Sequence, residues 1–409
     1  MKTKLLFSLS AFAAFFGASA QSVWPSETWS DATNITSVMS PSAAIELSGL
    51  HWNSVNNRLY AVQNDGRLRV LQYDASGGTF SQIANKSFDG GPEGITQVDL
   101  SANEVYTIDE NEYEIRKYTH NASFSTLTES RHWNLLQAPS PMPDTGNTGP
   151  EGIAFVPDSF LADSNFTSSV TGQPYVSTKG MGGLMFVAHQ DGGYIWVFDL
   201  NPDVNNDFAY VGKYKTSRSE SCDLAFDRST GLLYILHNVG SNYLQVTNMS
   251  LAPAPGSEPT FSTLNEYFIA NPTGSNTNVE GFALMPKCGD LTGSAFLCRD
   301  ASSSEALSVR QDVLRWFAPF LADGNCELSV NDPNQKAVIV YPNPTAETLF
   351  ISGLDSQKAN IAIFDLNGKL VKKQQQANSK IDVSKLAKGE YILKIDNGNS
   401  TQEIKFIKD

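Results

Sequence analysis

The chain has 409 residues, of which 41% are hydrophobic, so it is long enough for two or three folded domains and is not globally disordered. It carries 29 Lys and Arg against 43 Asp and Glu, a formal net charge of −14. This charge argues against nucleic acid or an anionic membrane surface as the main partner, because both attract basic patches. The negative charge is more consistent with a cation as the partner, or with a partner that binds through a cation.

The first 20 residues predict a secretory signal peptide. Lys2 and Lys4 precede an apolar run from Leu5 to Phe16, and the small residues at 17–20 predict cleavage before Gln21. The apolar run is too short to span a bilayer, and no later stretch approaches about 20 apolar residues, so we expect no membrane span. Residues 1–20 and 338–409 each carry a net charge of +2, which leaves −18 on the segment between them.

Residues 21–320 contain five similar units. Each has a short start, typically acidic-Gly-apolar, then a strand, a turn, a second apolar strand that ends in a polar residue, and a third strand. The starts fall at positions 48, 93, 151, 222 and 280. The spacing between successive starts is about the length of one four-stranded propeller blade. We therefore predict an all-β fold, a β-propeller of five or six blades. A sixth blade would be closed by residues 23–45 with 305–320; the alternative, a β-sandwich, is disfavoured by the repeats.

Three of the unit starts resemble a known family. The segments 91–95 (GPEGI), 149–155 (GPEGIAF) and 278–282 (NVEGF) resemble the six-bladed esterase-like phytase propellers, and more loosely β-propeller phytases and lactonase-type propellers. The resemblance implies calcium-dependent hydrolysis of esters at the central channel, with phosphoesters such as phytate favoured. The full set of basic phosphate-gripping residues is not found, so hydrolysis of lactones or carboxylic esters stays open.

The repeats predict a ring of functional side chains. In a propeller the innermost strands line the axis, so the residues at the unit starts converge there; several carboxylates cannot all stay ionised without a cation, and Ca²⁺ takes 6–8 oxygen ligands. The predicted metal ligands are Glu93, Glu151, Glu280, Asp109 and Asp223. The predicted catalytic residues are His189 and His237 as general bases and Arg299 as a clamp for an anionic group.

Two other interpretations of the same residues remain. Each glutamate could simply accept backbone N–H groups from the neighbouring blade. The whole propeller could be a non-catalytic module that binds a glycan or a protein at the cell surface.

Four cysteines allow two disulfides in an exported protein. Cys288 and Cys298 flank a turn and could cross-link a hairpin, and Cys222 could then pair with Cys326. The alternative is four free buried thiols.

Residues 338–409 predict a small antiparallel β-sandwich, preceded by a linker at 321–337. The segments 341–344 (YPNP), 364–369 (FDLNGK) and 386–395 (LAKGEYILKI) resemble the C-terminal sorting domain of the type IX secretion system of Bacteroidetes. The resemblance implies export across the outer membrane, with the secretion machinery as a partner and with the domain then removed or used for attachment. A carbohydrate-binding sandwich is the alternative.

Overall fold

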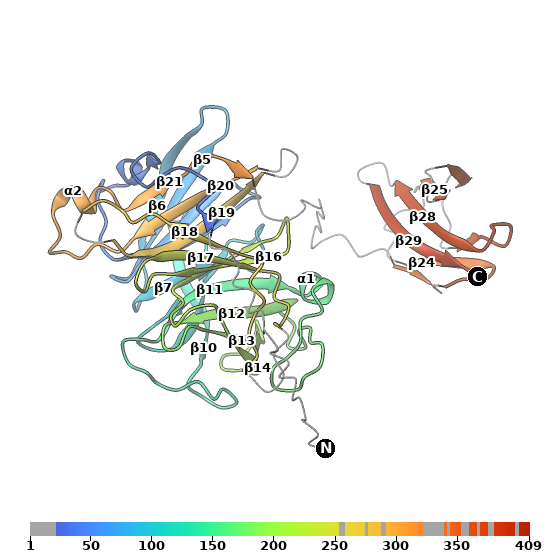
Figure 1. The fold of residues 1–409 in the computed structure, drawn as a ribbon, viewed down its shortest axis with the longest axis horizontal. Helices are drawn as coiled ribbons and strands as arrows, with labels where there is room; N and C mark the ends of the chain where they lie inside the picture. The colour runs from blue at the N-terminus through green and yellow to red at the C-terminus, as the bar shows by residue number, and fades with distance from the viewer. Residues whose placement is uncertain are drawn as a thin grey trace, which may run out of the picture. The chain divides into compact units, whose positions relative to one another are not determined.

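The computed structural model describes residues 22–252, 258–274, 277–287, 292–321, 339–341, 344–352, 360–365, 369–374, 380–396 and 401–409. The chain divides into two compact units, Met1–Leu328 and Ser329–Asp409. In the first unit five antiparallel sheets follow one another around a common axis, which confirms the predicted β-propeller (Figure 1). The predicted signal peptide and most of the predicted linker lie outside the described residues.

The first three blades are meanders of four strands that are consecutive in the chain. Apolar and aromatic residues fill their strands, because such side chains pack well between stacked sheets. Blade one contains β3 (Leu47–Asn53), β4 (Arg58–Gln63), β5 (Arg67–Asp74) and β6 (Thr79–Ser87). Blade two contains β7 (Pro92–Thr96), β8 (Glu104–Asp109), β9 (Glu114–His120) and β10 (Leu127–Asn134). Blade three contains β11 (Pro150–Pro157), β12 (Gly183–His189), β13 (Tyr194–Leu200) and β14 (Phe208–Lys215), with α1 (Asp158–Asp163) between β11 and β12.

The last two blades recruit the N-terminal segment. Blade four contains β15 (Asp223–Asp227), β16 (Leu232–His237), β17 (Asn242–Thr247) and β18 (Asn265–Ile269), and β1 (Ser22–Val23) joins β18 in parallel. Blade five contains β19 (Val279–Lys287), β20 (Thr292–Arg299), β21 (Leu314–Trp316) and β2 (Thr33–Asn34); η1 (Thr36–Val38) follows β2, α2 (Leu307–Arg310) precedes β21, and β22 (Phe320–Leu321) also pairs with β20. The segments considered for a sixth blade therefore complete the fifth, so the described propeller has five.

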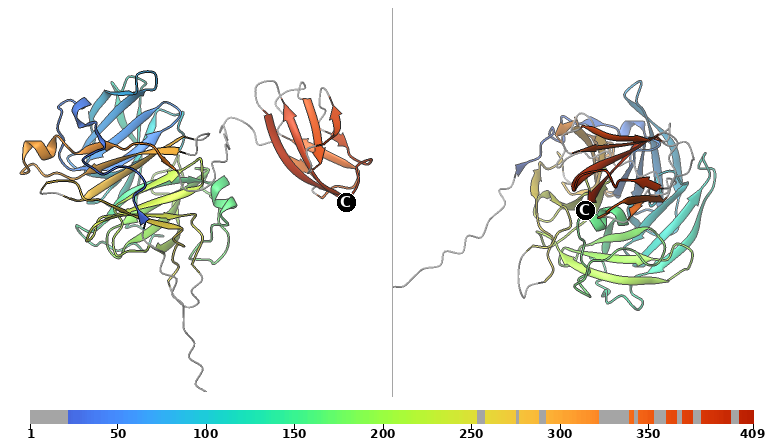
Figure 2. Two further views of the ribbon diagram at one scale, coloured as in Figure 1. Left: turned by 45° about the horizontal axis from the view of Figure 1, so that its top comes forward. Right: turned by 90° about the vertical axis from the view of Figure 1, so that its right-hand side faces the viewer.

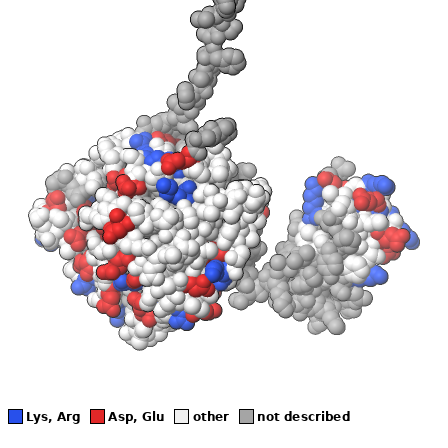
Figure 3. Space-filling model, turned by 90° about the horizontal axis from the view of Figure 1, so that it is seen from below, with Lys and Arg blue, Asp and Glu red and all other residues white. Residues whose placement is uncertain are grey.

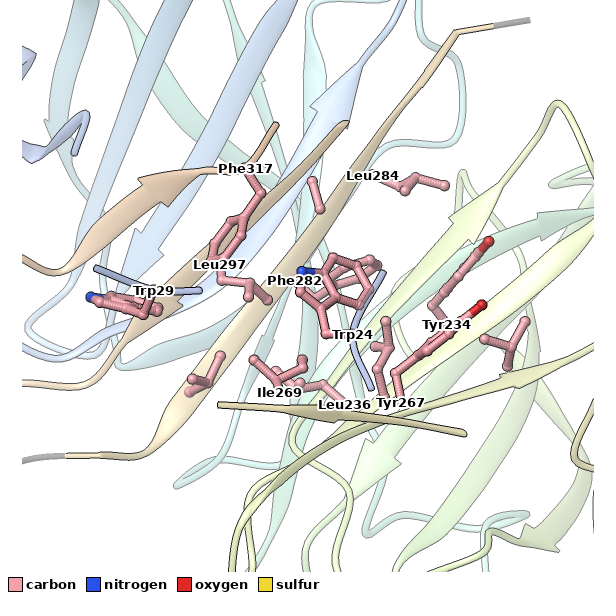
Figure 4. Close-up of a cluster of buried hydrophobic side chains, with 14 of the residues drawn as sticks. Trp24, Trp29, Tyr234, Leu236, Tyr267, Ile269, Phe282, Leu284, Leu297 and Phe317 are labelled. Atoms are coloured by element: carbon pink, nitrogen blue, oxygen red, sulfur yellow. The ribbon is translucent and has the colours of Figure 1, made fainter. Parts of the chain in front are cut away.

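Trp24 shows why the N-terminal segment stays in place. Its ring makes edge-on contacts with Tyr267 of blade four, Phe282 of blade five and Phe317, at centroid distances of 5.7, 6.3 and 6.4 Å (Figure 4). Such aromatic contacts add to the large apolar area that a buried Trp removes from water. Trp24 thus anchors the segment around it in the apolar cluster between blades four and five.

The five inner strands close into a ring, since each contacts the next and β19 contacts β3. The ring is tight because glycines face the neighbouring backbone. A Cβ atom on Gly94 would lie 2.7 Å from the Glu151 carbonyl oxygen, and one on Gly152 would lie 2.5 Å from the Cα of Asp223. Only glycine permits this approach.

Asp223 occupies the place that glycine has in the other four inner strands. Its Oδ1 accepts a hydrogen bond from the Leu224 backbone N–H and its Oδ2 accepts one from Phe282, both at 2.8 Å. The Leu50 backbone N–H also donates to this carboxyl. The side chain is fully buried and contacts three inner strands besides its own, so it fills the centre of the ring and closes the axis. The predicted central channel is therefore interrupted at this level.

The cysteines do not form the expected disulfides among the described residues. Cys222 and Cys298 are free and buried, which contradicts the predicted cross-links, while Cys288 and Cys326 lie outside the described residues. The Cys298 thiol donates to the backbone oxygens of Leu47 and Ser48 at 3.3 Å, and the Cys222 thiol donates to Leu236. Both thiols are thus packed into seams between strands, where they act as small core residues.

The C-terminal unit, drawn in orange and red in Figure 2, contains two antiparallel sheets. The two sheets share an apolar core. The first consists of β23 (Ile339–Tyr341), β24 (Thr348–Ser352) and β27 (Lys380–Asp382). The second consists of β25 (Asn360–Asp365), β26 (Leu370–Gln374), β28 (Gly389–Asp396) and β29 (Thr401–Lys408). Leu349 from the first sheet and Ile363, Leu393 and Phe406 from the second are fully buried. Within the described residues, no helix has the length and apolar character needed to cross a membrane.

Asp223→Ala should destabilise the propeller strongly. The substitution leaves three buried backbone N–H groups without an acceptor, and each such loss costs about 1–3 kcal/mol. We expect chemical denaturation to show the free energy of unfolding lowered by about 3 kcal/mol or more. Asp203→Ala, which removes an exposed carboxylate, is the control and should change it by less than about 0.5 kcal/mol. Equal stability of the two variants would refute the central role of Asp223.

Candidate functional site

Above the closed axis, the start of the inner strand is irregular in four of the five blades. The pairing register shifts between Pro92 and Gly94, between Pro150 and Ile153, and between Val279 and Gly281, and a similar shift occurs in blade one. Such a β-bulge bends a strand and re-aims the extra residue. In three blades the residue within the bulge is a glutamate, so Glu93, Glu151 and Glu280 converge at one end of the axis, as predicted.

Six carboxylates influence one another at this end of the axis, which we call the acidic mouth. The pKa of Glu151 is raised by burial and by the charges of Glu93, Glu280, Glu110 and Glu220. The pKa of Glu280 is raised by burial, then by the charge of Asp300, and then by the charges of Glu93, Glu220 and Glu110. The acidic mouth thus consists of Glu93, Glu110, Glu151, Glu220, Glu280 and Asp300.

Burial makes these carboxylates reluctant to ionise. Glu93 is 5% exposed, and burial raises its pKa to about 8, with repulsion by Glu110 and Asp300 adding to the rise and a Ser48 hydrogen bond opposing it. Burial also raises the pKa of Glu110 and of Glu220. Near neutral pH the mouth therefore holds protons that a cation could replace.

Glu151 is a buried member of the mouth that makes no side-chain hydrogen bond among the described residues. Its side chain is 7% exposed. In the described part of the chain its carboxylate has no hydrogen-bond partner, whereas Glu110 accepts the Gly149 backbone N–H at 3.2 Å and Glu280 accepts the Asn238 amide at 3.4 Å. A buried polar group without a partner is costly, so a ligand that contacts Glu151 would offset this cost.

Two of the predicted metal ligands do not belong to the mouth. Asp223 lies at the level of the glycine ring, and backbone N–H groups occupy both of its oxygens. Asp109 accepts the backbone N–H groups of Gly91 at 2.9 Å and Glu112 at 3.0 Å, and it lies 3.7 Å from the Arg116 guanidinium. Both side chains are thus engaged in holding the backbone, which corrects their assignment as ligands.

The predicted catalytic residues His237 and Arg299 are used inside their own blades. His237 is fully buried, with Nδ1 against the Glu220 carbonyl and Nε2 3.3 Å from Gln245 Oε1. Arg299 is 1% exposed and donates to the Thr273 carbonyl at 2.7 Å and to the Asp312 carbonyl at 2.9 Å. These contacts tie loops to the blade ends, so the structure does not bring either side chain to the carboxylates.

His189 is also buried, at the end of β12. Its ring lies 6.4 Å from that of Tyr113 and 6.2 Å from that of Trp196, and among the described residues neither ring nitrogen has a hydrogen-bond partner. Burial lowers its pKa to about 4. A neutral imidazole of such low basicity, enclosed by aromatic rings, is a poor general base at neutral pH.

The predicted ligand set does not include Glu110, Glu220 and Asp300, which the structure places in the mouth. Glu110 and Asp300 each follow directly after a predicted site residue, Asp109 or Arg299, so the signal was present one position further on. Glu220 lies in the loop before β15, where blade four has Cys222 instead of a glutamate. No repeat position pointed to it.

The donor set of the mouth fits a hard cation, because all six side chains offer carboxylate oxygens. Within the described ranges, however, no group of three or more His, Cys, Asp and Glu side chains is arranged to hold a metal ion. Direct coordination by three carboxylates therefore requires side-chain rotation. Other acidic side chains are scattered over the surface, as one face in Figure 3 shows, so only part of the negative charge of the propeller belongs to the mouth.

Comparison with known families matches two parts of the chain. The model of the secretion system C-terminal sorting domain matches residues 339–409, which confirms the predicted sorting domain. The family described as SdiA-regulated matches residues 27–160, within the propeller. Neither is a phytase family, and no curated protein matches the chain. The chain is thus an exported propeller protein that carries a type IX secretion sorting domain, bound for the cell surface or the extracellular space.

Two solved structures show distant likeness. PorZ, a surface component of the type IX secretion system of Porphyromonas gingivalis, is 13% identical with a TM-score of 0.31, and the match covers 88% of this chain and 51% of PorZ. A chain of the nidogen/laminin complex is 13% identical with a TM-score of 0.32, and the match covers 68% of this chain and 81% of that one. This chain spans about half the length of PorZ. Likeness at this level carries no argument about function.

The mouth should make the stability of the protein fall as the pH rises above neutral. A carboxyl whose pKa is higher in the folded state than in the unfolded state favours folding at low pH, and this contribution is lost as the pH rises through the folded value. For Glu93 this contribution to stability is lost between about pH 4.5, the ordinary pKa of the group, and about pH 8, its pKa in the folded protein. The buried histidines, whose pKa values are lowered, act in the opposite direction only below about 6.5.

Between pH 6.5 and 8 in chelator, we therefore expect the free energy of unfolding to fall by about 1 kcal/mol or more. Glu93→Gln should flatten this dependence, while Asp203→Asn should leave it unchanged. Denaturant titrations at several pH values measure it, and a wild-type stability that rises across this range would contradict the assignment.

Proposed function

We propose that this exported propeller is a binding module that takes a cation, with calcium as the expected ion, at its acidic mouth. The observation that carries the proposal is the Glu151 carboxylate, which is buried among four other carboxylates and has no hydrogen-bond partner in the described chain. Glu93, Glu151 and Glu280 would hold the ion, with Glu110, Glu220 and Asp300 around them. A bound cation would neutralise their repulsion and expose a positive centre to an anionic or oxygen-rich partner such as a glycan or a protein.

Two features favour binding over hydrolysis. The axis is closed at Asp223, so the mouth is shallow. Of the predicted catalytic residues, His237 and Arg299 are engaged in blade contacts and His189 is enclosed by aromatic rings. The mouth thus lacks the imidazole base and the anion clamp that the predicted hydrolytic mechanism uses.

A calcium-dependent ester hydrolase is the second candidate, favoured by Glu93. A carboxyl with a pKa of about 8 can exchange a proton at neutral pH, as a general acid or base must. Calcium would polarise the substrate oxygen. Phosphoesters as in phytate, lactones and carboxylic esters all remain candidate substrates.

Calcium should stabilise the full mature chain. At a concentration of 100 times its Kd, the ion should add about 2.7 kcal/mol to the free energy of unfolding. We expect a clear rise of Tm on calcium titration at pH 7.5, lost in the double variant Glu151→Gln plus Glu280→Gln. Asp203→Asn should respond like the wild type. A wild type without a saturable rise, or a double variant that keeps it, would refute the cation site.

Turnover separates the two candidates. A panel of phosphate esters, lactones and aryl esters is incubated with the calcium-loaded wild type and with Glu93→Gln. For a binding module we expect no turnover above the background. Hydrolysis that requires calcium and is lost in Glu93→Gln but kept in Asp203→Asn would establish the hydrolase instead.

A further inference from the structure

A small cavity lies on the other side of Asp223, at the opposite end of the axis from the acidic mouth. Its volume is about 30 Å³, which is enough for one or two water-sized groups. The wall has both polar and apolar surface, and most of its residues come from the inner strands, after the glycine ring. Its principal lining residues include Leu50, His51, Thr96, Phe155, Leu224 and Arg228.

Arg228 brings a positive charge to this cavity. It lies in the turn between β15 and β16 of blade four, and its Nη2 donates to the backbone oxygens of Gln97 at 2.6 Å and Val98 at 3.0 Å in blade two. The guanidinium also lies 5.5 Å from the centroid of the Phe155 ring of blade three. The side chain therefore reaches across the axis.

The charge of Arg228 is not neutralised by a direct partner. Among the described residues no carboxylate lies within ion-pair distance of it; Asp99 only favours its charged form electrostatically. Burial lowers its pKa to about 10, so the group stays charged at neutral pH. A partly buried cation without a counter-ion is unfavourable, and its remaining N–H donors are available to an anion.

His51 supplies a second polar group. Its Nε2 is buried and has no hydrogen-bond partner in the described chain. Burial and the nearby charge of Arg228 lower the pKa of His51 to about 3, so its imidazole is neutral and can donate one N–H. Its ring lines the same cavity as the guanidinium.

We propose that this cavity is a binding site for a small monovalent anion, held between the Arg228 guanidinium and the His51 ring. A charge of the opposite sign would satisfy both groups, whereas a water molecule would leave the guanidinium charge uncompensated. The volume admits a halide ion or a carboxylate no larger than formate, and it excludes larger anions such as gluconate and phosphate esters. The site is separate from the acidic mouth and does not depend on its function.

The test uses the full mature chain in a sodium gluconate buffer, since gluconate is too large to enter. Chloride or formate replaces gluconate at constant ionic strength while Tm is measured. We expect a saturable rise of Tm with at least one of the two anions at millimolar concentration. A response to chloride alone identifies a halide site, and a response to formate identifies a site for small carboxylates. Arg228→Gln should abolish the rise, and Arg67→Gln, a change at a more exposed arginine, should retain it.

A second measurement covers the case in which Arg228→Gln does not fold. The ³⁵Cl resonance should broaden in the presence of the wild-type protein if the site takes chloride, and formate should remove the broadening if the site also takes formate. The proposal fails if neither anion acts beyond the gluconate background in the wild type, or if a folded Arg228→Gln responds like the wild type.

Discussion

The carboxyl group of Asp223 is the interaction on which the propeller depends. Five inner strands meet around one axis, and buried backbone N–H groups that lack an acceptor would make this meeting costly. Asp223 accepts such groups from β3, β15 and β19 with one side chain. Because it also fills the centre of the ring, it divides the axis into two ends, an acidic mouth on one side and a small cavity beneath Arg228 on the other.

The same packing explains why the acidic mouth cannot relieve its own repulsion. Gly94 and Gly152 let the neighbouring backbones pack directly on one another, so the strands that carry Glu93 and Glu151 lie close together. Only protonation, side-chain rotation or a cation can lower the electrostatic energy there. Unfavourable arrangements of this kind persist in proteins chiefly where function requires them.

The short motifs of the sequence predicted the blades and part of the site. The Glu-Gly starts revealed the blades and the three converging glutamates, because a bulged strand start is encoded by adjacent residues. The sequence could not show which of two neighbouring polar residues, such as Asp109 and Glu110, faces the mouth, since that depends on loop contacts to Gly91 and Gly149. The meeting of residues 23–45 with 305–320 was predicted, but as a sixth blade. The sequence could not show that β21 also pairs with β20, which makes β2 and β21 the outer strands of blade five.

Since the axis is closed, a ligand of the mouth can contact only its floor and its rim, and selectivity must come from the rim. Between blades two and three this rim is firmly held. The buried Tyr113 hydroxyl accepts the Thr145 backbone N–H at 2.7 Å, and the backbone of Thr148 and Gly149 accepts N–H groups from Asp191 and Gln190 of blade three. The segment held in this way leads directly into Glu151. The Glu151 carboxylate therefore lies beside a well-anchored part of the rim, so in the proposed binding module the cation and its partner would be contacted at the same place.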